Sequence, residues 1–223
     1  MQGNISIVIP AYNEAGSIRE TIQALREFPE IKEIIVVDDG SRDHTAQYAR
    51  QEGATVWQHS RNLGKGAALN TGSALSTGDV IVFLDGDLGS SAREACKLWQ
   101  PVLAGEADCV IARFPKAKRK GGFGLVKRLA QWGVTRIGGT PVQAVLSGQR
   151  AMTRKALEAI FPWPDGFGAE MGATIRLLKQ GYRLKEVEVA MEHRETGRDW
   201  AGFCHRGRQF GHIMKTLAKE ALR

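Results

Sequence analysis

The strongest constraint on the fold of this chain is a series of short apolar runs separated by segments of helical periodicity. The runs at 5–10, 33–38, 79–84 and 109–112 are rich in Ile and Val and contain few polar residues. Strands that are apolar on both faces are typical of parallel sheets covered by helices on both sides. These runs therefore predict an α/β fold with an open, mainly parallel sheet, in which ligands bind beyond the carboxyl ends of the strands.

The segments between these runs repeat their apolar residues at helical spacing. Caps and glycine stops set the expected limits of each segment. We expect helices at 17–28, 45–53, 65–75, 91–103, 123–137, 154–160, 168–180 and 200–222, and further strands at 54–58, 147–152 and 185–192. The alternation continues along the chain without an internal repeat, so its 223 residues suit one domain.

Two carboxylates follow the strand expected at 79–84, and a single glycine separates them. Asp85 and Asp87 would stand together at the carboxyl end of that strand, on the same sheet edge as Asp38 and Asp39. Carboxylates this close repel each other unless a cation shares them, and Mg²⁺ or Mn²⁺ binds oxygen ligands together with substrate phosphates. The motif therefore predicts a metal and phosphate site. An acidic turn is the structural alternative, because Asp and Gly also favour tight turns.

The composition is that of an ordinary globular protein, with 43% hydrophobic and 25% charged residues. Its three cysteines are widely spaced, which favours a reduced compartment and core packing over disulfides. The N-terminal residues lack the charged region followed by an apolar region that is typical of a signal peptide. No apolar run is long enough to cross a bilayer. We therefore expect a cytoplasmic protein.

The net charge of +7 is unevenly distributed along the chain. Between Arg113 and Arg136 there are eight Lys or Arg residues and no Asp or Glu, and the helices expected at 123–137 and 200–222 are amphipathic and basic. Such a patch favours an anionic partner, which could be a membrane surface, a phosphorylated substrate or nucleic acid. A solvated charged face or a helix that covers the sheet would give the same pattern.

Four motifs, three at strand ends and one before a helix, resemble those of one enzyme family. They are Val-Ile-Pro-Ala-Tyr-Asn-Glu at 8–14, Val-Val-Asp-Asp-Gly-Ser at 36–41, Asn-Leu-Gly-Lys-Gly at 62–66 and Asp-Gly-Asp at 85–87. In this order they resemble the family two nucleotide-sugar glycosyltransferases, and within them the dolichyl-phosphate or polyprenyl-phosphate sugar synthases. The resemblance implies the GT-A fold, a single Rossmann-like domain with an open mixed, mainly parallel sheet. It also implies a nucleotide-sugar-binding half at 1–113 and an acceptor-binding half at 114–223.

The resemblance also implies roles for individual residues. Asp85 and Asp87 would hold Mg²⁺ or Mn²⁺ and the sugar diphosphate, and the ion would neutralise the departing diphosphate. An aromatic face offers stacking to a base, and a carboxylate accepts hydrogen bonds from base or ribose. The residues implied to bind the nucleotide sugar besides Asp85 and Asp87 are Pro10, Tyr12, Glu14, Val37, Asp39, Lys65, Gly86, Arg113 and Arg194.

The second half resembles the family less closely. Ser-Gly-Gln-Arg at 147–150 is similar to a Ser-Gly-Phe-Arg element of these synthases, with Gln149 in place of the aromatic residue and Ala144 where Asp is common. Gly-Phe-Gly-Ala-Glu at 166–170, together with His193 and Arg194, instead resembles glucosyl-3-phosphoglycerate synthases. That similarity implies His193 as a third metal ligand and Glu170 as a catalytic base or orienting group for the acceptor. The structural alternatives are a surface histidine and a favourable charge at a helix start.

The sequence therefore predicts a metal-dependent glycosyltransferase that uses a UDP or GDP sugar and a polyprenyl phosphate acceptor. It would contact the inner face of the cell membrane peripherally, through its basic amphipathic segments. A small soluble phosphorylated acceptor such as 3-phosphoglycerate is the first alternative, and the oligomeric state, including a homo-oligomer, is left open. A sugar-phosphate nucleotidyltransferase would need a glycine-rich, Arg-containing loop after the first strand, and residues 10–14 do not fit one. A nucleic-acid-binding protein would account for the basic charge but not for the ordered acidic motifs, so we expect no nucleic acid partner.

Overall fold

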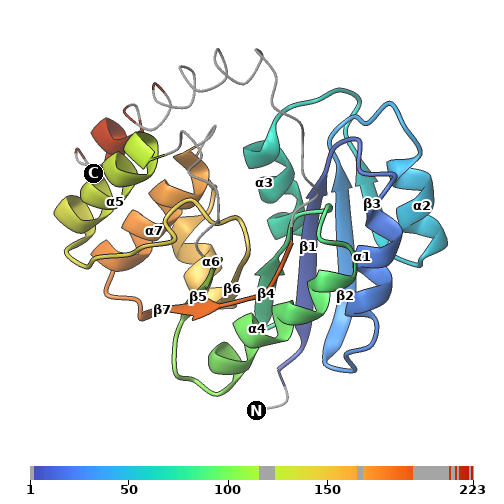
Figure 1. Ribbon diagram of the computed structural model, residues 1–223, viewed down its shortest axis with the longest axis horizontal. Helices are drawn as coiled ribbons and strands as arrows, with labels where there is room; N and C mark the ends of the chain where they lie inside the picture. The colour runs from blue at the N-terminus through green and yellow to red at the C-terminus, as the bar shows by residue number, and fades with distance from the viewer. Residues whose placement is uncertain are drawn as a thin grey trace.

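The computed structural model describes residues 3–115, 124–164 and 168–192, with 211, 214, 216–220 and 222 near the C-terminus. Within these residues seven strands form one sheet in the order β3-β2-β1-β4-β6-β5-β7 (Figure 1). The strands are β1 (Ile5–Ala11), β2 (Ile31–Asp38), β3 (Thr55–Gln58), β4 (Val80–Phe83), β5 (Cys109–Arg113), β6 (Arg150–Thr153) and β7 (Leu184–Glu188). All neighbouring pairs are parallel except those that β6 makes with β4 and β5. The predicted open mixed, mainly parallel sheet is thus confirmed.

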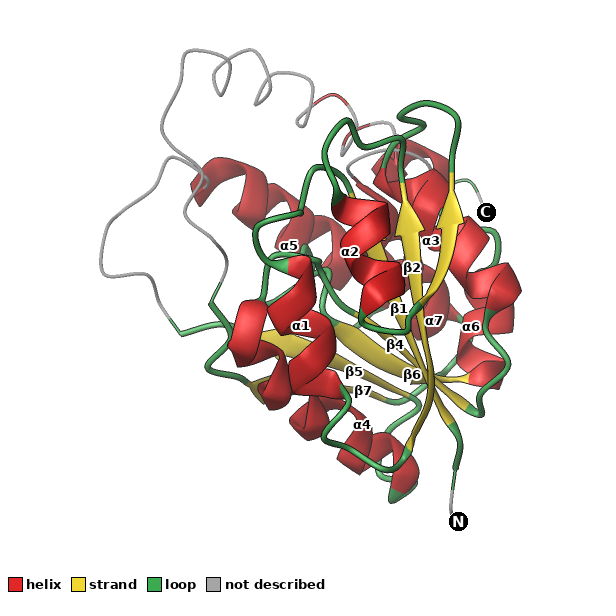
Figure 2. Ribbon diagram, turned by 90° about the vertical axis from the view of Figure 1, so that its right-hand side faces the viewer, coloured by secondary structure: helices red, strands yellow, loops and turns green. Residues whose placement is uncertain are grey.

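Helices cover both faces of this sheet (Figure 2). One face packs on α1, α2 and α4, and the other packs on α3, α5, α6 and α7. The helices are α1 (Ile18–Leu25), α2 (Thr45–Gln51), α3 (Lys65–Leu75), α4 (Cys96–Leu103), α5 (Gly124–Gly138), α6 (Arg154–Ile160) and α7 (Ala169–Lys179), with a 3₁₀ helix η1 (Gly89–Ala95) before α4. The inner strands β1, β4 and β5 are buried along nearly their whole length because each of their faces meets a helix layer.

The antiparallel strand β6 is the feature that most affects the site. The sequence predicted a strand at 147–152, but β6 begins at Arg150 and inserts between β4 and β5. Because it runs against both neighbours, the residues just before it lie at the carboxyl ends of β4 and β5. Ser147, Gly148 and Gln149 are therefore delivered to the predicted ligand-binding edge.

Close packing fixes α3 against the sheet beside that edge. A Cβ atom added at Gly72 in α3 would lie 2.2 Å from Cγ1 of Val8 in β1, so helix and strand approach more closely than a side chain would allow.

The core residue Cys109 is fully buried, and burial raises the pKa of its thiol to about 11. Its predicted role as a core residue is confirmed.

Some predicted boundaries differ from the structure. The helix predicted at 91–103 begins as η1 and becomes α-helical only from Cys96. The strand predicted at 185–192 ends at Glu188. Of the C-terminal helix predicted at 200–222, the structure describes helical residues at 211, 214 and 216–220, and the rest lies outside the described residues.

Candidate active site

The carboxyl ends of β1, β2 and β4 lie at one edge of the sheet, as the alternation of strands and helices predicted. Ala11 pairs with Asp38 in register, and Val8 pairs with Phe83 two residues before Asp85. The first residues of α3 and α7 reach the same edge, through Lys65 and Glu170. Helix N-termini favour negative charge, so the edge combines acidic side chains with features that attract anions.

Lys65 is the central cation of this edge. Its Nζ lies 2.7 Å from Oδ1 of Asp85 and 3.4 Å from Oε1 of Glu170. Partial burial of the ammonium group lowers the pKa of Lys65, but the two carboxylates outweigh burial and hold that pKa above its usual value. Because 41% of the side chain is still exposed, water reaches it and the ion pairs remain exchangeable. The group is a cation at every physiological pH, and it is within reach of a bound diphosphate.

Gln149 holds the other oxygen of Asp85. Its Nε2 donates to Oδ2 of Asp85 at 2.6 Å, and the side chain is almost completely buried. A Cβ atom added at Gly148 would lie 2.5 Å from Nζ of Lys65, so the neighbouring residue must be small to let the lysine approach. The residue that the sequence marked as a departure from the family motif therefore orients Asp85.

Arg150 connects the elements that carry Gln149 and Glu170. It is fully buried and donates to the carbonyl oxygens of Ser147 at 2.6 Å and Glu170 at 3.2 Å. Burial lowers the pKa of Arg150, and the nearby Glu170 partly offsets that effect. Its guanidinium joins the loop before β6 to the first turn of α7, which fixes Gln149 and Glu170 relative to each other.

The loop that carries Asp87 is anchored to α1. The hydroxyl of Thr21 donates to the carbonyl oxygen of Gly86 at 3.1 Å and accepts the N–H of Gly89 at 2.9 Å. Glu14 lies against the same loop, since a Cβ atom added at Gly86 would be 3.2 Å from its Cγ. The backbone around Asp87 is thus held from both sides, while its carboxylate stays partly exposed.

The residues predicted to bind base and ribose differ in exposure. Tyr12 is 43% exposed and can offer its ring to a ligand, whereas the side chain of Val37 is fully buried against α3. Asp39 is also buried, and its carboxylate accepts hydrogen bonds from the N–H groups of Leu63 and Gly64 at 2.9 and 2.7 Å. In the structure Asp39 therefore organises the loop that leads to α3. Its contact with the nucleotide stays a prediction.

Next to Asp85 a pocket of about 1060 Å³ opens toward α5. Arg113 lies at the end of β5 and pairs with Glu188 at 3.0 Å. The wall combines apolar side chains with cations and with the carboxylates of Asp85 and Glu188, which suits a ligand that has both a charged and an apolar part. Its lining includes Lys65, Asp85, Arg113, Phe114, Pro115, Lys127, Leu146 and Gln149.

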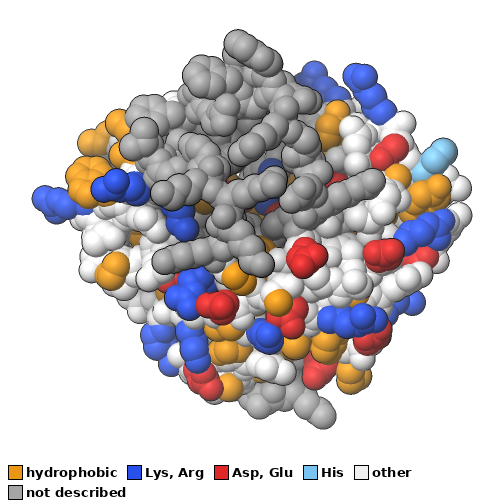
Figure 3. Space-filling model, in the orientation of Figure 1, with side chains coloured by type: hydrophobic (Ala, Val, Ile, Leu, Met, Phe, Trp, Pro, Cys, Tyr) orange, Lys and Arg blue, Asp and Glu red, His pale blue; other side chains and the backbone are white. Residues whose placement is uncertain are grey.

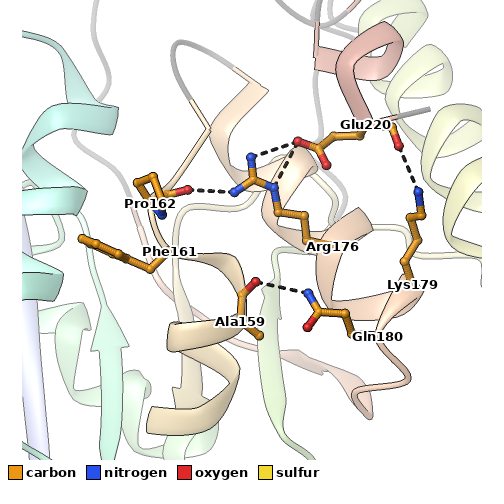
Figure 4. Close-up of a pocket in the computed structure, with 7 residues that line it drawn as sticks. All are labelled: Ala159, Phe161, Pro162, Arg176, Lys179, Gln180 and Glu220. Atoms are coloured by element: carbon orange, nitrogen blue, oxygen red, sulfur yellow. Dashed lines mark hydrogen bonds and ion pairs between the residues drawn. The ribbon is translucent and has the colours of Figure 1, made fainter. Parts of the chain in front are cut away.

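A second pocket of about 260 Å³ lies away from this edge, between α6, α7 and residue 220 (Figure 4). Its charged groups are committed inside the protein. Arg176 donates to the carbonyl oxygens of Ile160 and Pro162 and pairs with Glu220 at 3.0 Å. The ion pair between Arg176 and Glu220 joins the C-terminal helical residues to α7, and we assign this pocket no ligand.

The donor set at the sheet edge suits a hard divalent ion. Asp87 and Asp85 supply carboxylate oxygens, and diphosphate oxygens would complete the shell of Mg²⁺ or Mn²⁺. Among the described residues no group of three or more His, Cys, Asp or Glu side chains surrounds one point. His193, the predicted third ligand, and Arg194 lie outside the described residues. The described residues therefore fit such an ion, and the carboxylates of Asp85 and Asp87 would be its protein ligands.

Sequence reasoning missed three residues that shape the site: Gln149, Thr21 and His59. Gln149 was noticed only as a mismatch, because the antiparallel insertion of β6 is a property of the folded sheet. Thr21 gave no signal, since a threonine within an amphipathic helix is common. His59 lies between two motifs, and its ring is 2.7 Å from Asp39.

Comparisons with known proteins agree with the resemblance predicted from the four motifs. A family model described as "Glycosyl transferase family 2" matches residues 6–161. An uncharacterized protein of Methanocaldococcus jannaschii is 34% identical over 195 residues, which cover 83% of this chain and 80% of that protein. An undecaprenyl-phosphate 4-deoxy-4-formamido-L-arabinose transferase of Pseudomonas fluorescens is 31% identical over 202 residues, or 86% of this chain. The chain spans only 57% of the length of that transferase.

The fold has solved counterparts. A crystal structure of glucosyl-3-phosphoglycerate synthase from Mycobacterium tuberculosis, in complex with Mn²⁺, UDP and phosphoglyceric acid, has a TM-score of 0.83 and is 27% identical. The match covers 98% of this chain and 78% of that chain. The predicted GT-A fold is confirmed by this likeness, which extends through both halves of the sheet.

Proposed function

The chain belongs to glycosyl transferase family 2, and on this basis we propose that it moves a sugar from a UDP or GDP sugar to a polyprenyl phosphate. Its activity as a glycosyltransferase follows from the family, whereas the donor base and the acceptor are our proposal. Residues 1–113 would bind the nucleotide sugar, and residues 114–223 would bind the acceptor. A divalent ion held by Asp85 and Asp87 would neutralise the departing diphosphate.

On the donor side, three side chains would act together. Asp87 offers its carboxylate to the ion, and Asp85 is held in place by Lys65 and Gln149. Lys65 would donate to a phosphate oxygen of the leaving group, because its ammonium is already at the same edge as Asp85. Preorganised donors of this kind stabilise the charge that develops on a leaving group.

Glu170 would orient the acceptor or the lysine rather than remove a proton from the acceptor. Its carboxylate is almost buried and lies 3.4 Å from Nζ of Lys65. A phosphate acceptor is already ionised near neutral pH and needs no strong base. A hydroxyl acceptor would need one, so the effect of removing the Glu170 carboxylate bears directly on the acceptor class.

The observation that carries the choice of acceptor is the mixed lining of the pocket beside Asp85. Arg113 and Lys127 can pair with a phosphate, and Phe114 and Leu146 can pack on an apolar chain. The name of the Pseudomonas fluorescens relative supports a lipid phosphate acceptor of this type. A small phosphorylated acceptor is the second candidate, because the Mycobacterium tuberculosis structure holds phosphoglyceric acid.

A panel of acceptors separates the two candidates. The protein would be incubated with Mn²⁺ or Mg²⁺, a set of UDP and GDP sugars, and either a short-chain polyprenyl phosphate or 3-phosphoglycerate. We expect a glycosylated lipid that partitions into organic solvent. Turnover with 3-phosphoglycerate alone would replace the proposed acceptor by the second candidate, and turnover with neither would reject both.

We also propose that α5 brings the protein to the inner face of the cell membrane. Trp132 is 63% exposed on this helix, and Lys127, Arg128 and Arg136 are exposed beside it. In Figure 3 hydrophobic side chains and Lys or Arg side chains lie next to one another over α5. None of the helices in the described part of the chain is long and apolar enough to cross a membrane. Contact of the kind we propose, through an exposed aromatic and basic face, is peripheral.

A further inference from the structure

His59 connects two elements that meet at the active-site edge. It follows β3, and its ring is almost buried, with 8% of the side chain exposed. Nδ1 lies 2.7 Å from Oδ1 of Asp39, and Nε2 lies 3.0 Å from Oγ1 of Thr71 in α3. Its backbone N–H also donates to the carbonyl oxygen of Asp38 at 2.9 Å. One imidazole thus ties the end of β2 to the side of α3.

Asp39, the partner of His59, fixes the turn from which α3 begins. Its Oδ1 accepts the N–H of Leu63 and its Oδ2 accepts the N–H of Gly64. Gly64 has a φ of +94°, a conformation that only glycine adopts readily, and its carbonyl oxygen accepts the N–H groups of Ala67 and Ala68. The residue after this turn is Lys65. The direction of the lysine side chain therefore depends on how Asp39 is held.

The chemistry of the ring matches this arrangement. A neutral imidazole donates through one nitrogen and accepts through the other, so Nδ1–H can bond Asp39 while Nε2 accepts the hydroxyl proton of Thr71. A buried carboxylate needs hydrogen-bond donors on both oxygens. Without His59, Oδ1 of Asp39 would keep a single described donor, the N–H of Leu63. The carboxylate would then be bound by the two N–H groups of the turn itself, and the turn would lose the link that the ring makes to Thr71 in α3.

We propose that His59 is a positioning residue for Lys65, acting through Asp39 on the turn at 63–64 and through Thr71 on α3. The proposal rests on the proposed function, because Lys65 is assigned there to the diphosphate. Nδ1 bonds Asp39 at the end of β2, and Nε2 bonds Thr71 on α3. The turn held by Asp39 and the helix α3 meet at Lys65, whose ammonium contacts Asp85. An apolar side chain could fill the same space but could not hold either partner.

Single substitutions test the connection. We expect His59→Leu to lower kcat between about tenfold and a hundredfold, because a misplaced catalytic group can cost this much. His59→Asn should recover most of that loss, since its amide nitrogen can donate to Asp39 in place of Nδ1. Thr71→Val should give a smaller loss. His44→Leu changes an exposed histidine before α2 and should leave kcat unchanged.

A double-mutant cycle separates positioning from a purely structural role. If His59 acts through Lys65, Lys65→Met and the double variant Lys65→Met/His59→Leu should have the same kcat. Additive losses, or full kcat in both His59→Leu and Thr71→Val, would overturn the proposal. If His59→Leu does not fold, the cycle is run with Thr71→Val in its place. Equal kcat of Lys65→Met and the double variant then supports the proposal, and additive losses overturn it. Full activity of Lys65→Met would instead reject the role that the proposed function gives to the lysine.

Discussion

At the scale of single residues, the proposed site centres on a lysine that has two carboxylate partners. Lys65 pairs with Asp85 and Glu170, and its raised pKa keeps it cationic. We expect Lys65→Met to lower kcat by roughly 10²- to 10³-fold, the usual cost of removing one donor to a developing charge. Steady-state kinetics with a saturating nucleotide sugar measure the loss.

A matched control for Lys65→Met exists at the opposite edge of the sheet. Lys185 is the second residue of β7 and pairs with Glu106 at 2.6 Å, so Lys185→Met also removes one partner of a surface ion pair. That variant should keep full activity. Equal losses in both variants would mean that a general loss of surface charge, and not the place of Lys65, causes the effect.

A second residue-scale prediction concerns Asp87 and the divalent ion. We expect Mn²⁺ to raise the affinity for UDP and Asp87→Asn to abolish that rise, because a neutral amide is a weaker ligand for a hard cation than a carboxylate. Calorimetric titration of UDP with and without Mn²⁺ measures this directly. Asp79→Asn, at the other end of β4, should leave the effect of Mn²⁺ intact. An unchanged effect of Mn²⁺ in the Asp87 variant would remove that residue from the metal site.

At the scale of elements, the position of α3 depends on the absence of a side chain at Gly72. Helix propensity alone predicts that Gly72→Ala stabilises the protein by up to about 1 kcal/mol. The added Cβ would lie 2.2 Å from Cγ1 of Val8, however, and overpacking costs about 1–3 kcal/mol. We therefore expect the free energy of unfolding to fall, as measured by urea denaturation.

Whether the free energy of unfolding of Gly72→Ala rises or falls decides between helix propensity and overpacking. Ala74 is exposed on the same helix, so Ala74→Gly reports the propensity contribution without a packing change. We expect that variant to lose about 0.5–1 kcal/mol. A more stable Gly72→Ala protein would show that α3 can move away from β1 at little cost.

The element scale also shows what the sequence could and could not predict. The strands β1, β2 and β4 were predicted, as apolar runs at 5–10, 33–38 and 79–84, because strands buried on both faces have a continuous apolar pattern. The contact of Gln149 with Asp85 was not predictable, because it requires the antiparallel insertion of β6. His59 was missed for a similar reason, since its partners Asp39 and Thr71 become neighbours only when α3 packs on the sheet.

At the scale of the whole molecule, the exposed face of α5 predicts attachment to anionic membranes. Each basic residue near such a surface contributes about 1 kcal/mol, so Arg128→Gln should weaken partition onto phosphatidylserine vesicles about fivefold. Trp132→Ala should weaken it further, and added salt should release the protein. Sedimentation with vesicles measures the bound fraction.

The chain offers a control for the aromatic part of this prediction. Trp57 is 52% exposed on β3, at the far edge of the sheet, and α5 covers a different part of the molecule (Figure 1). Trp57→Ala should bind vesicles as the parent protein does. Equal loss in both tryptophan variants would mean that α5 is not the membrane-facing element.

The central claim is that the pocket between Asp85 and α5 receives a phosphorylated lipid, and two-substrate kinetics of Lys127→Met test it most directly. With a short-chain polyprenyl phosphate, we predict an acceptor KM roughly ten- to a hundredfold higher, the cost of one charge-assisted hydrogen bond. The KM for the nucleotide sugar should not change, and Lys155→Met, on the exposed side of α6, should change neither constant. An unchanged acceptor KM, or a rise confined to the nucleotide sugar, would contradict the claim.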